Sequence, residues 1–291
     1  MPIRNLSDTI AAYENGRYHV QRFYKGANAT TGDTRWQDWS FAAGQPAYDA
    51  RIGVAGQFNP YVAARNDAIW FPPINAGEHR HLKRVVLATV ASGASQLTTD
   101  GVLYDLLGVY PLIDGDSTDE QVFTNDSPLP RYADGVGVIP VLVNHVSPML
   151  ARCAGTMIYT DSDGVQRTTT IGVALGGTGN VVSTYGDVTS FGALSLPTNG
   201  GRGVKQIDSI QFTTAPGGLF AIYMLRPLTT ILNCDGAGTA DKIATEKFLA
   251  LQNAWHYPRI YDGAWLGFFL RGNGGSRTFS SVYGYLEFIW G

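Results

Sequence analysis

The side chains best suited to chemistry form an acidic run in one short segment. Asp114, Asp116, Asp119 and Glu120 concentrate carboxylates there, and carboxylate oxygens are the ligands that hard cations such as Ca²⁺ prefer. The run lacks the full Asp-x-Asp-x-Asp-Gly…Glu spacing of a calcium-binding loop. We therefore expect a solvated loop or a contact with another subunit, and no bound metal.

A second candidate is the tetrapeptide Glu78-His79-Arg80-His81. The two histidines, at i and i+2, share one face of an extended strand, where two imidazoles can ligate zinc or copper. No third ligand is suggested by position. We interpret the segment as a polar lead-in to a strand and predict no cofactor.

Motifs of enzymes are missing from the sequence. It contains no Gly-x-Ser-x-Gly elbow, no His-Glu-x-x-His pair and no phosphate-binding Gly-x-x-x-x-Gly-Lys. The run Gly176-Gly177-Thr178-Gly179 is followed by Asn180 and not by a helix signal, unlike a dinucleotide fingerprint. Carboxylate pairs that meet only in the fold leave a hydrolase open as an alternative. We expect no enzymatic activity.

Aromatic rings are spread through residues 1–75 with no sustained period of 2 or 3.6. A disordered tail is poor in such rings. We interpret this segment as an extended arm laid against its own body or against a neighbouring chain, each ring filling a pocket. The alternative is a set of irregular strands and loops of the same domain. The rings predicted to contact another subunit are Trp36, Trp39, Phe41, Tyr48, Phe58, Tyr61, Trp70 and Phe71.

Two arginines complete the predicted contact set. Arg131 lies in Leu-Pro-Arg-Tyr, and Arg259 lies in Pro-Arg-Ile-Tyr-Asp-Gly. In a turn fixed by proline, a guanidinium can stack on the neighbouring ring and bond backbone carbonyls or carboxylates. Bracing of the loops of one subunit is the alternative for both.

The elements that must position these residues are mostly strands. Short apolar runs separated by turn residues predict strands at 83–90, 102–112, 136–146, 205–214 and 219–231. A helix is the alternative at 102–112, where four apolar residues fit a helical stripe but Gly108 and Pro111 favour a strand. Pro140 predicts an edge position or a bulge for its strand. Asp161 to Gly164 has the residue types of a turn, which predicts a hairpin from Thr156 to Leu175.

The last quarter of the chain, Trp265 to Trp290, holds two aromatic runs around a glycine-rich segment. This arrangement predicts a β-hairpin. Large side chains occupy both faces of the second run, so we expect that strand to be central in a sheet.

Two segments carry helix signals. Leu6 to Asn15 has Ser7 as its expected N-cap and Gly16 just past its end. The best helix candidate is Thr239 to Asn253, with Thr239 as the cap and an apolar stripe along one face. The whole pattern predicts a mainly β fold, with a β-sandwich or jelly-roll-like body at 76–291, one short helix and an extended N-terminal arm at 1–75.

Composition bounds the possible partners. Of the 291 residues, 44% are hydrophobic and only 15% are charged, against roughly 25% charged in a typical globular domain. The surface is then kept soluble by uncharged polar residues or is covered by neighbouring subunits. The net charge of −3 and the lack of a basic run argue against nucleic acid as a partner.

Other sequence features concern the compartment. With no secretory signal and no apolar stretch of about 18 residues, we expect a soluble protein made in the cytosol, with no membrane partner. Cys153 and Cys234 are expected to be buried, reduced thiols, with a disulfide as the alternative.

Five segments together resemble a family of virion structural proteins from tailed bacteriophages. They are Tyr110 to Asp119 (YPLIDGDSTD), Leu129 to Gly135 (LPRYADG), Tyr159 to Val165 (YTDSDGV), Leu225 to Leu228 (LRPL) and Pro258 to Ala264 (PRIYDGA). The resemblance covers residues 80–291 and implies assembly on a phage head, neck or tail, without a catalytic reaction.

We therefore expect a non-enzymatic virion protein, most simply a decoration or cement protein that stabilises the capsid. Its expected partners are copies of itself, in a trimer, and the major capsid or other virion proteins. The alternatives are a tail, collar or fibre-anchor component, and a receptor- or carbohydrate-binding virion protein. Deletion of residues 1–75 is expected to leave a folded body that no longer holds to particles.

Overall fold

The fold is known from a computed structural model. It describes Ile3 and residues 5–26, 36–40, 42–46, 53–63, 69–91, 98–146, 152–174, 184–185, 194–233, 243–248, 257–273 and 279–291. These residues form antiparallel β-sheets and one short helix. The predicted mainly β fold is confirmed.

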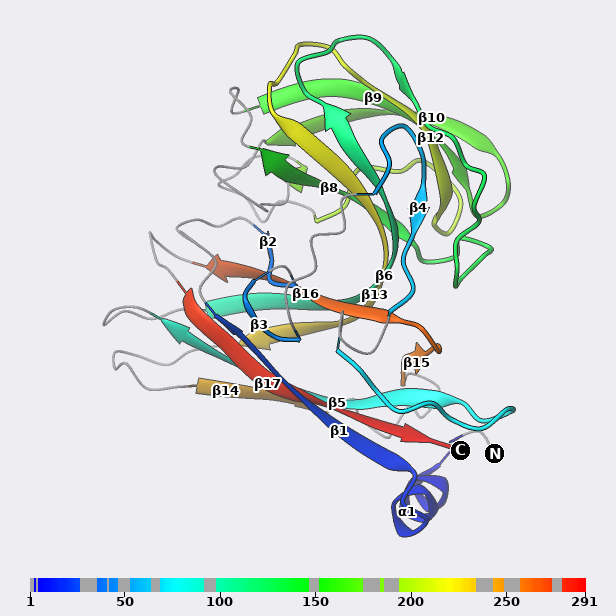
Figure 1. Ribbon diagram of the computed structural model, residues 1–291, viewed down its shortest axis with the longest axis vertical. Coiled ribbons are helices and arrows are strands. Elements are labelled where there is room, and N and C mark those ends of the chain that lie inside the picture. The colour runs from blue at the N-terminus through cyan, green and yellow to red at the C-terminus, as the bar shows by residue number, and fades with distance from the viewer. Residues whose placement is uncertain are drawn as a thin grey trace.

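Three sheets make up the protein, and we name each after one of its interior strands (Figure 1). The β17 sheet has the order β14 (Ile243–Phe248), β5 (Arg80–Ala91), β17 (Phe279–Trp290), β1 (Tyr18–Gly26) and β3 (Gly44–Gln45), and β15 (Arg259–Ile260) also pairs with β5. The β6 sheet has the order β2 (Gln37–Asp38), β16 (Trp265–Asn273), β6 (Thr98–Asp114), β13 (Leu219–Asn233) and β8 (Ile139–Val146), and β4 (Asn59–Pro60) also pairs with β6. The β9 sheet has the order β11 (Thr184–Tyr185), β10 (Gln166–Ala174), β9 (Arg152–Asp161), β12 (Val204–Phe212) and β7 (Gln121–Val122).

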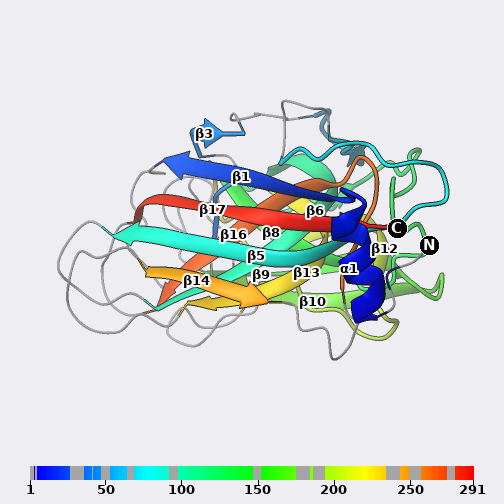
Figure 2. The same ribbon diagram turned by 90° about the horizontal axis from the view of Figure 1, so that it is seen from below.

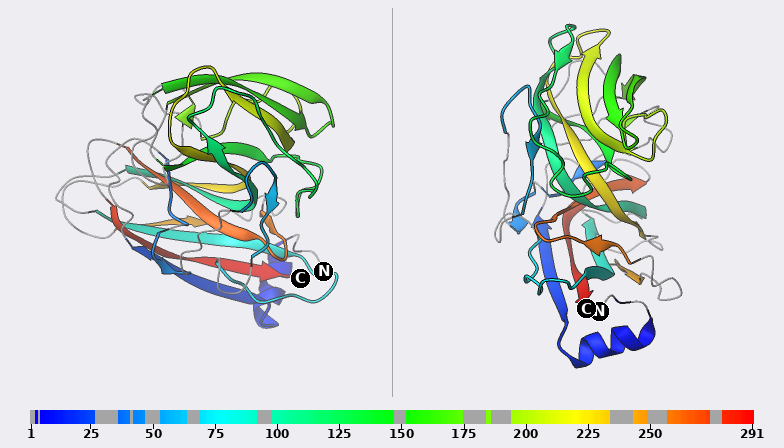
Figure 3. Two further views of the ribbon diagram at one scale, coloured as in Figure 1. Left: turned by 45° about the horizontal axis from the view of Figure 1, so that its top comes forward. Right: turned by 90° about the vertical axis from the view of Figure 1, so that its right-hand side faces the viewer.

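The two long strands β6 and β13 join the two ends of the molecule. They run beside the β17 sheet and then curve towards the β9 sheet (Figures 1 and 3). Their ladder carries three register shifts, one of them beside Pro227. Such bulges increase the local twist and let a strand bend. A bulge also accommodates a proline, which has no N–H for the ladder.

Each end of the β6 and β13 pair has its own apolar core. Between the β17 sheet and the β6 sheet lie fully buried Leu87, Leu103 and Leu286. Between the β9 sheet and the curved part of the β6 sheet lie Met157 and Phe220. Successive side chains along a strand point to opposite faces of its sheet. β6 therefore contributes side chains to both cores and also to the far face of its sheet, the face turned away from the β17 sheet.

Segments from the predicted arm cover that far face of the β6 sheet. Trp36 and Tyr61 pack there with Tyr104, Trp265 and Phe269. Elsewhere in the arm, β1 pairs with β17 along all nine of its residues. Where residues 1–75 are described, they therefore lie against the body of their own chain.

The N-terminal helix α1 (Leu6–Glu14) confirms the first helix prediction, with a different cap. The side chain of Asn5, and not Ser7, accepts a hydrogen bond from the Asp8 N–H at 2.9 Å. Gly16 follows the helix with φ 67°, a left-handed conformation that glycine adopts without strain. Among the described residues, no helix is long and apolar enough to cross a membrane.

The predicted C-terminal hairpin is wrong. β16 pairs with β6 and β2, whereas β17 pairs with β5 and β1 in a different sheet. Alternating apolar residues mark a strand but do not identify its partner, and both strands bury enough apolar surface to sit inside separate sheets. The central position of β17 is confirmed, because it lies between β5 and β1.

The helix predicted from Thr239 to Asn253 is also wrong in its described part. Residues Ile243–Phe248 form strand β14, in register with β5 from Thr89 to Arg84. The free edge of β5 supplies ladder partners, and this tertiary pairing overrides a helical stripe of only three apolar residues. The rest of the predicted helix lies outside the described residues.

Several strand predictions are confirmed. β8 carries Pro140 and lies at the edge of its sheet, as a proline requires. β9 and β10 pair as a hairpin whose turn contains Gly164 at φ 77°.

The cysteine prediction is confirmed for Cys153, which is buried and forms no disulfide. Cys234 lies outside the described residues.

Candidate functional site

Most of the aromatic residues in the predicted contact set are buried inside their own chain. Phe41 and Tyr48 lie outside the described residues. The buried members are Trp36, Trp39, Phe58, Tyr61 and Phe71. Each of these rings fills a core of its own chain. Their burial therefore argues against a direct contact with a second subunit, which stays a prediction.

Arg131 braces the inside of its own subunit. Its Nε and Nη2 donate to the two carboxylate oxygens of Asp105 at 2.9 and 2.8 Å. Nη2 also donates to the carbonyl of Leu106, and Nη1 donates to the carbonyl of Tyr61. Both side chains are buried. Burial raises the pKa of Asp105, although Arg131 acts in the opposite direction. The arrangement matches the bracing alternative.

Arg259 belongs to a cluster of rings and guanidinium groups at the surface, which we call the tyrosine cluster. Tyr132 and Tyr261 meet edge to face at 5.0 Å between ring centroids. The Arg226 guanidinium lies 5.5 Å from the Tyr132 ring centroid, and that of Arg259 lies 4.5 Å from the Tyr261 ring centroid. Three of the five segments that resemble phage virion proteins therefore meet in one place.

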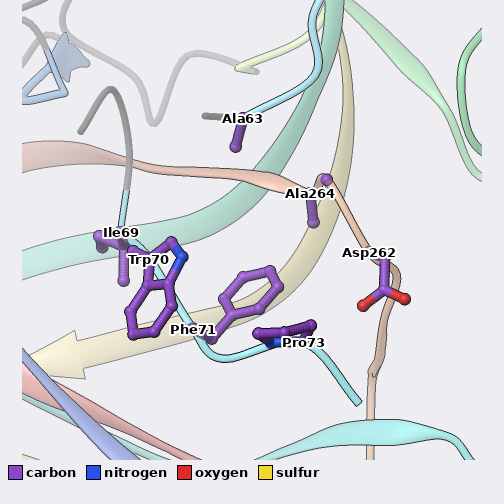
Figure 4. A pocket seen from close by; sticks show the side chains of 8 residues that line it. Ala63, Ile69, Trp70, Phe71, Pro73, Asp262 and Ala264 are labelled. Atoms are coloured by element: carbon purple, nitrogen blue, oxygen red, sulfur yellow. The ribbon is translucent and has the colours of Figure 1, made fainter. Parts of the chain in front are cut away.

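Trp70 differs from the other predicted rings because it is only half-buried and lines a cavity of about 270 Å³. We call this cavity the Trp70 pocket. Figure 4 shows Trp70 and Asp262 on opposite sides of it, with Phe71 and Pro73 between them. The Trp70 ring is also held edge-on by His19 of β1, at 5.9 Å between centroids.

The largest exposed apolar side chains of the N-terminal strand lie on one side of the β17 sheet. Along β1, Tyr18, Val20 and Tyr24 are 46%, 43% and 50% exposed, while the alternating residues point inward. In the neighbouring strand, Tyr283 lies opposite Tyr24, and Tyr285 lies opposite Arg22. We call this surface the outer face. Figure 2 looks onto it, and α1 crosses it only at one end.

The end of the outer face under α1 is closed by a charged network. The buried carboxylate of Glu287 accepts a hydrogen bond from the Tyr13 hydroxyl and lies 3.7 and 3.3 Å from the cationic nitrogens of Lys83 and Arg84. Burial and the adjacent carboxylate raise the pKa of Tyr13. Beside this network, Ala12 packs in one apolar cluster with Ile289. Helix α1 is therefore fastened to its own sheet.

A second buried network holds the segment that follows β1. Oδ1 of Asp38 accepts hydrogen bonds from the Tyr104 hydroxyl and the Ser40 N–H, both at 2.9 Å. Burial raises the pKa of Asp38 to about 6 against the opposing effect of these hydrogen bonds. Lys25 donates to the carbonyls of Ser40, Ala42 and Pro46, and burial lowers its pKa to about 8. The polar groups here serve to fix loops.

The acidic run forms a turn that bonds mainly to itself. The Asp116 N–H donates to the Asp114 carboxylate at 2.8 Å, and Glu120 accepts from the Ser209 hydroxyl at 2.6 Å.

The second candidate for metal binding was the tetrapeptide Glu78 to His81. In it, Nδ1 of His81 lies 3.3 Å from the carbonyl oxygen of Tyr257. Within the described residues, no group of three or more His, Cys, Asp or Glu side chains is placed to hold a metal ion.

Sequence reasoning missed the buried charges. Lys25 follows Phe23 by two positions in an alternating strand, so its inward direction was available as a signal. Nothing local marked Asp38 or Asp105 as buried, because Tyr104 and Arg131, which bond them, come from distant parts of the chain.

Neither a protein-family model nor a curated protein matches the chain. Among solved structures, it is weakly similar to that of the infectious bursal disease virus Gx strain, with 12% identity over 94% of this chain and 81% of that chain, at a TM-score of 0.18. It has a similar likeness to the VP2 subviral particle of that virus, with 11% identity, 94% and 80% coverage, and a TM-score of 0.17. TM-scores this low do not establish a common fold or function.

Proposed function

We propose that this chain is a non-enzymatic structural protein of a bacteriophage particle that binds neighbouring virion subunits through the outer face. The observation that supports this most directly is the row of exposed Tyr18, Val20 and Tyr24 beside Tyr283 and Tyr285. Neighbouring exposed apolar side chains mark contact sites when they form a patch larger than roughly a few hundred Å², which is uncommon on soluble monomers.

The residue types of the outer face suit a protein contact. Tyrosine and arginine are enriched among the residues that contribute most to binding at interfaces. Here Arg22 is exposed between Val20 and Tyr24 on the same strand face. Regular ladders hold the backbone of β1 and β17, so little backbone freedom is lost when a partner binds.

The virion role itself is supported by the resemblance to tailed-phage proteins. Its segments build the tyrosine cluster, where Tyr132 meets Tyr261. These contacts are made within one chain, so the resemblance supports the framework of the body and does not itself identify the outer face as a contact.

The finer assignment is a decoration or cement protein of the head. In this arrangement the outer face packs on the major capsid protein or on copies of this chain in a closed trimer, and repeated contacts of about 800 Å² per partner reinforce the lattice. A tail, collar or fibre-anchor role differs in copy number, because a head lattice carries far more copies than a collar.

A binding experiment with purified phage heads that lack this protein tests the proposal. The double variant Tyr18→Ser/Tyr24→Ser should lose co-sedimentation by more than about tenfold, because two contact rings are removed. The matched control is Val165→Ser, which changes a side chain that is 47% exposed in the β9–β10 turn, at the far end of the molecule. Thermal unfolding of both variants verifies that the fold is kept.

The outcomes separate the alternatives. Wild-type binding by the double variant would exclude the outer face as the contact. Wild-type protein that binds tails or collars but not heads would favour the collar alternative over the decoration role.

A further inference from the structure

The Trp70 pocket has the features of a small-molecule site. It combines an apolar floor, formed by Phe71 and Pro73, with the half-buried indole of Trp70 and one carboxylate, that of Asp262 (Figure 4). Ligand sites are typically lined by hydrophobic and aromatic side chains with a few fixed polar groups. Neither the outer face nor the tyrosine cluster supplies these lining side chains.

The carboxylate in the pocket is held in place. Arg80, whose side chain is fully buried, donates from Nη1 to Oδ1 of Asp262 at 3.0 Å. Arg80 also stacks over the Phe71 ring, with 4.2 Å from Cζ to the ring centroid, and bonds the carbonyl of Pro72. The Asp262 side chain remains 68% exposed. It is therefore oriented by the protein and still accessible to a ligand.

Local charge selects a neutral ligand over a cationic one. A carboxylate beside aromatic rings can attract a basic group. In this pocket, however, the negative charge of Asp262 is already paired with Arg80, and Arg80 already occupies one face of Phe71. A cationic ligand would meet a like charge at both contacts.

We propose that the Trp70 pocket binds one pyranose unit of a carbohydrate, with an apolar face of the sugar against Trp70 and its hydroxyl groups donating to Asp262. An ionised carboxylate only accepts hydrogen bonds, which suits sugar hydroxyls. A volume of about 270 Å³ lies just below the range of pockets that hold drug-sized ligands, which suits a single ring. This binding goes beyond the proposed subunit contact, and either can fail without the other.

The test uses the full chain labelled with 5-fluorotryptophan, which gives one ¹⁹F signal for each of the six tryptophans. The signal that disappears in Trp70→Phe belongs to Trp70. Titration with methyl glucoside, methyl mannoside, methyl galactoside and N-acetylglucosamine should shift that signal saturably, with a dissociation constant in the millimolar range for at least one sugar. Saturation-transfer NMR on the unlabelled protein gives an independent readout.

Matched variants assign the binding to the pocket. Trp70→Ala and Asp262→Asn should each reduce sugar binding by more than about tenfold, because each removes one of the two contacts. Val165→Ser and Asp119→Asn, which change an exposed apolar side chain and an exposed carboxylate elsewhere, should bind like the wild type. Unchanged thermal unfolding of the Asp262→Asn variant verifies that its pairing with Arg80 is not needed for the fold.

Three results would overturn the proposal. The first is the absence of a saturable shift at Trp70 with any of these sugars. The second is full sugar binding by the Trp70→Ala variant. The third is a saturable Trp70 shift with N-acetyl-lysine methylamide or a proline-rich peptide and none with sugars, which would assign the pocket to a protein partner.

Discussion

The Arg131 guanidinium and the Asp105 carboxylate form a bidentate ion pair inside the protein. Only 4% of the Arg131 side chain and 1% of the Asp105 side chain are exposed. Oδ1 of Asp105 also accepts a hydrogen bond from the N–H of Trp265, the first residue of β16. The pair thus connects the loop that carries Arg131 to β6 and β16.

Removing one partner of this pair should strongly destabilise the fold. In Arg131→Met, Asp105 stays buried without its cation, and the carbonyls of Tyr61 and Leu106 lose a donor. We expect a loss of about 3–5 kcal/mol in the free energy of unfolding, measured with urea. The control is Arg259→Met, which removes an exposed guanidinium from the Tyr261 ring and should change stability by less than about 1 kcal/mol. Equal effects of the two changes would contradict the bracing role of Arg131.

Asp38 should make stability fall as pH rises. Its pKa is about 6 in the folded protein, against 3.8 as the ordinary value, so folding favours the protonated form. That contribution is complete below pH 4 and is lost as the pH passes 6. Asp38→Asn cannot ionise, so its stability relative to the wild type should increase between pH 4 and pH 6, by up to about 3 kcal/mol. Denaturation curves across this range, compared between the two proteins, provide the measurement. A difference that does not vary with pH would show that Asp38 is not the titrating group.

Deletion of residues 1–75 should unfold the protein, contrary to the expectation from sequence that a folded body remains. The deletion removes β1 from β17 and takes away Phe23, whose ring lies 4.7 Å from that of Phe268. Circular dichroism and limited proteolysis report the result. Deletion of residues 1–16 is the control, because it removes α1 and leaves β1 in place, and it should retain the sheets. A compact, protease-resistant product of the larger deletion would restore the arm as a separate unit.

Gly108 should not tolerate a side chain. A Cβ at this position would lie 2.3 Å from Cζ of Phe58 and 2.6 Å from the carbonyl oxygen of Asn59. Gly108→Ala should therefore displace the segment that carries β4 and lower the free energy of unfolding by about 1–3 kcal/mol. Gly172→Ala in β10, where a Cβ meets nothing within 4 Å, is the matched control and should be neutral or slightly stabilising. Equal stability of the two variants would show that Phe58 can move away freely.

Local signals in the sequence predicted the strands better than their partners. Pro140 identified an edge strand, and Asp161 to Gly164 identified a hairpin turn, because proline and glycine act through the backbone of the residue itself. The pairing of β16 and β17 could not be predicted in this way. β16 pairs with β6 and β17 pairs with β5. These pairings depend on which strand edges are still unpaired in the folded protein, which no local pattern in the sequence shows.

The candidate sites follow the same division. Trp70 was identified by its type, but Asp262 enters the pocket from a distant turn, so no spacing could join the two. Alternation along β1 contained the outer face, because Tyr18, Val20 and Tyr24 recur every second or fourth position. The aromatic residues after β1 lack this alternation, so residues 1–75 as a whole resemble an irregular arm.

β6 and β13 take part in the apolar interior at both ends of the molecule. Unfolding of either end would disturb the packing of the other end, because the same two strands continue through both cores. Calorimetry should accordingly record one sharp heat-absorption peak and no separate step for either half. Local damage at one end is therefore resisted by the packing of both ends.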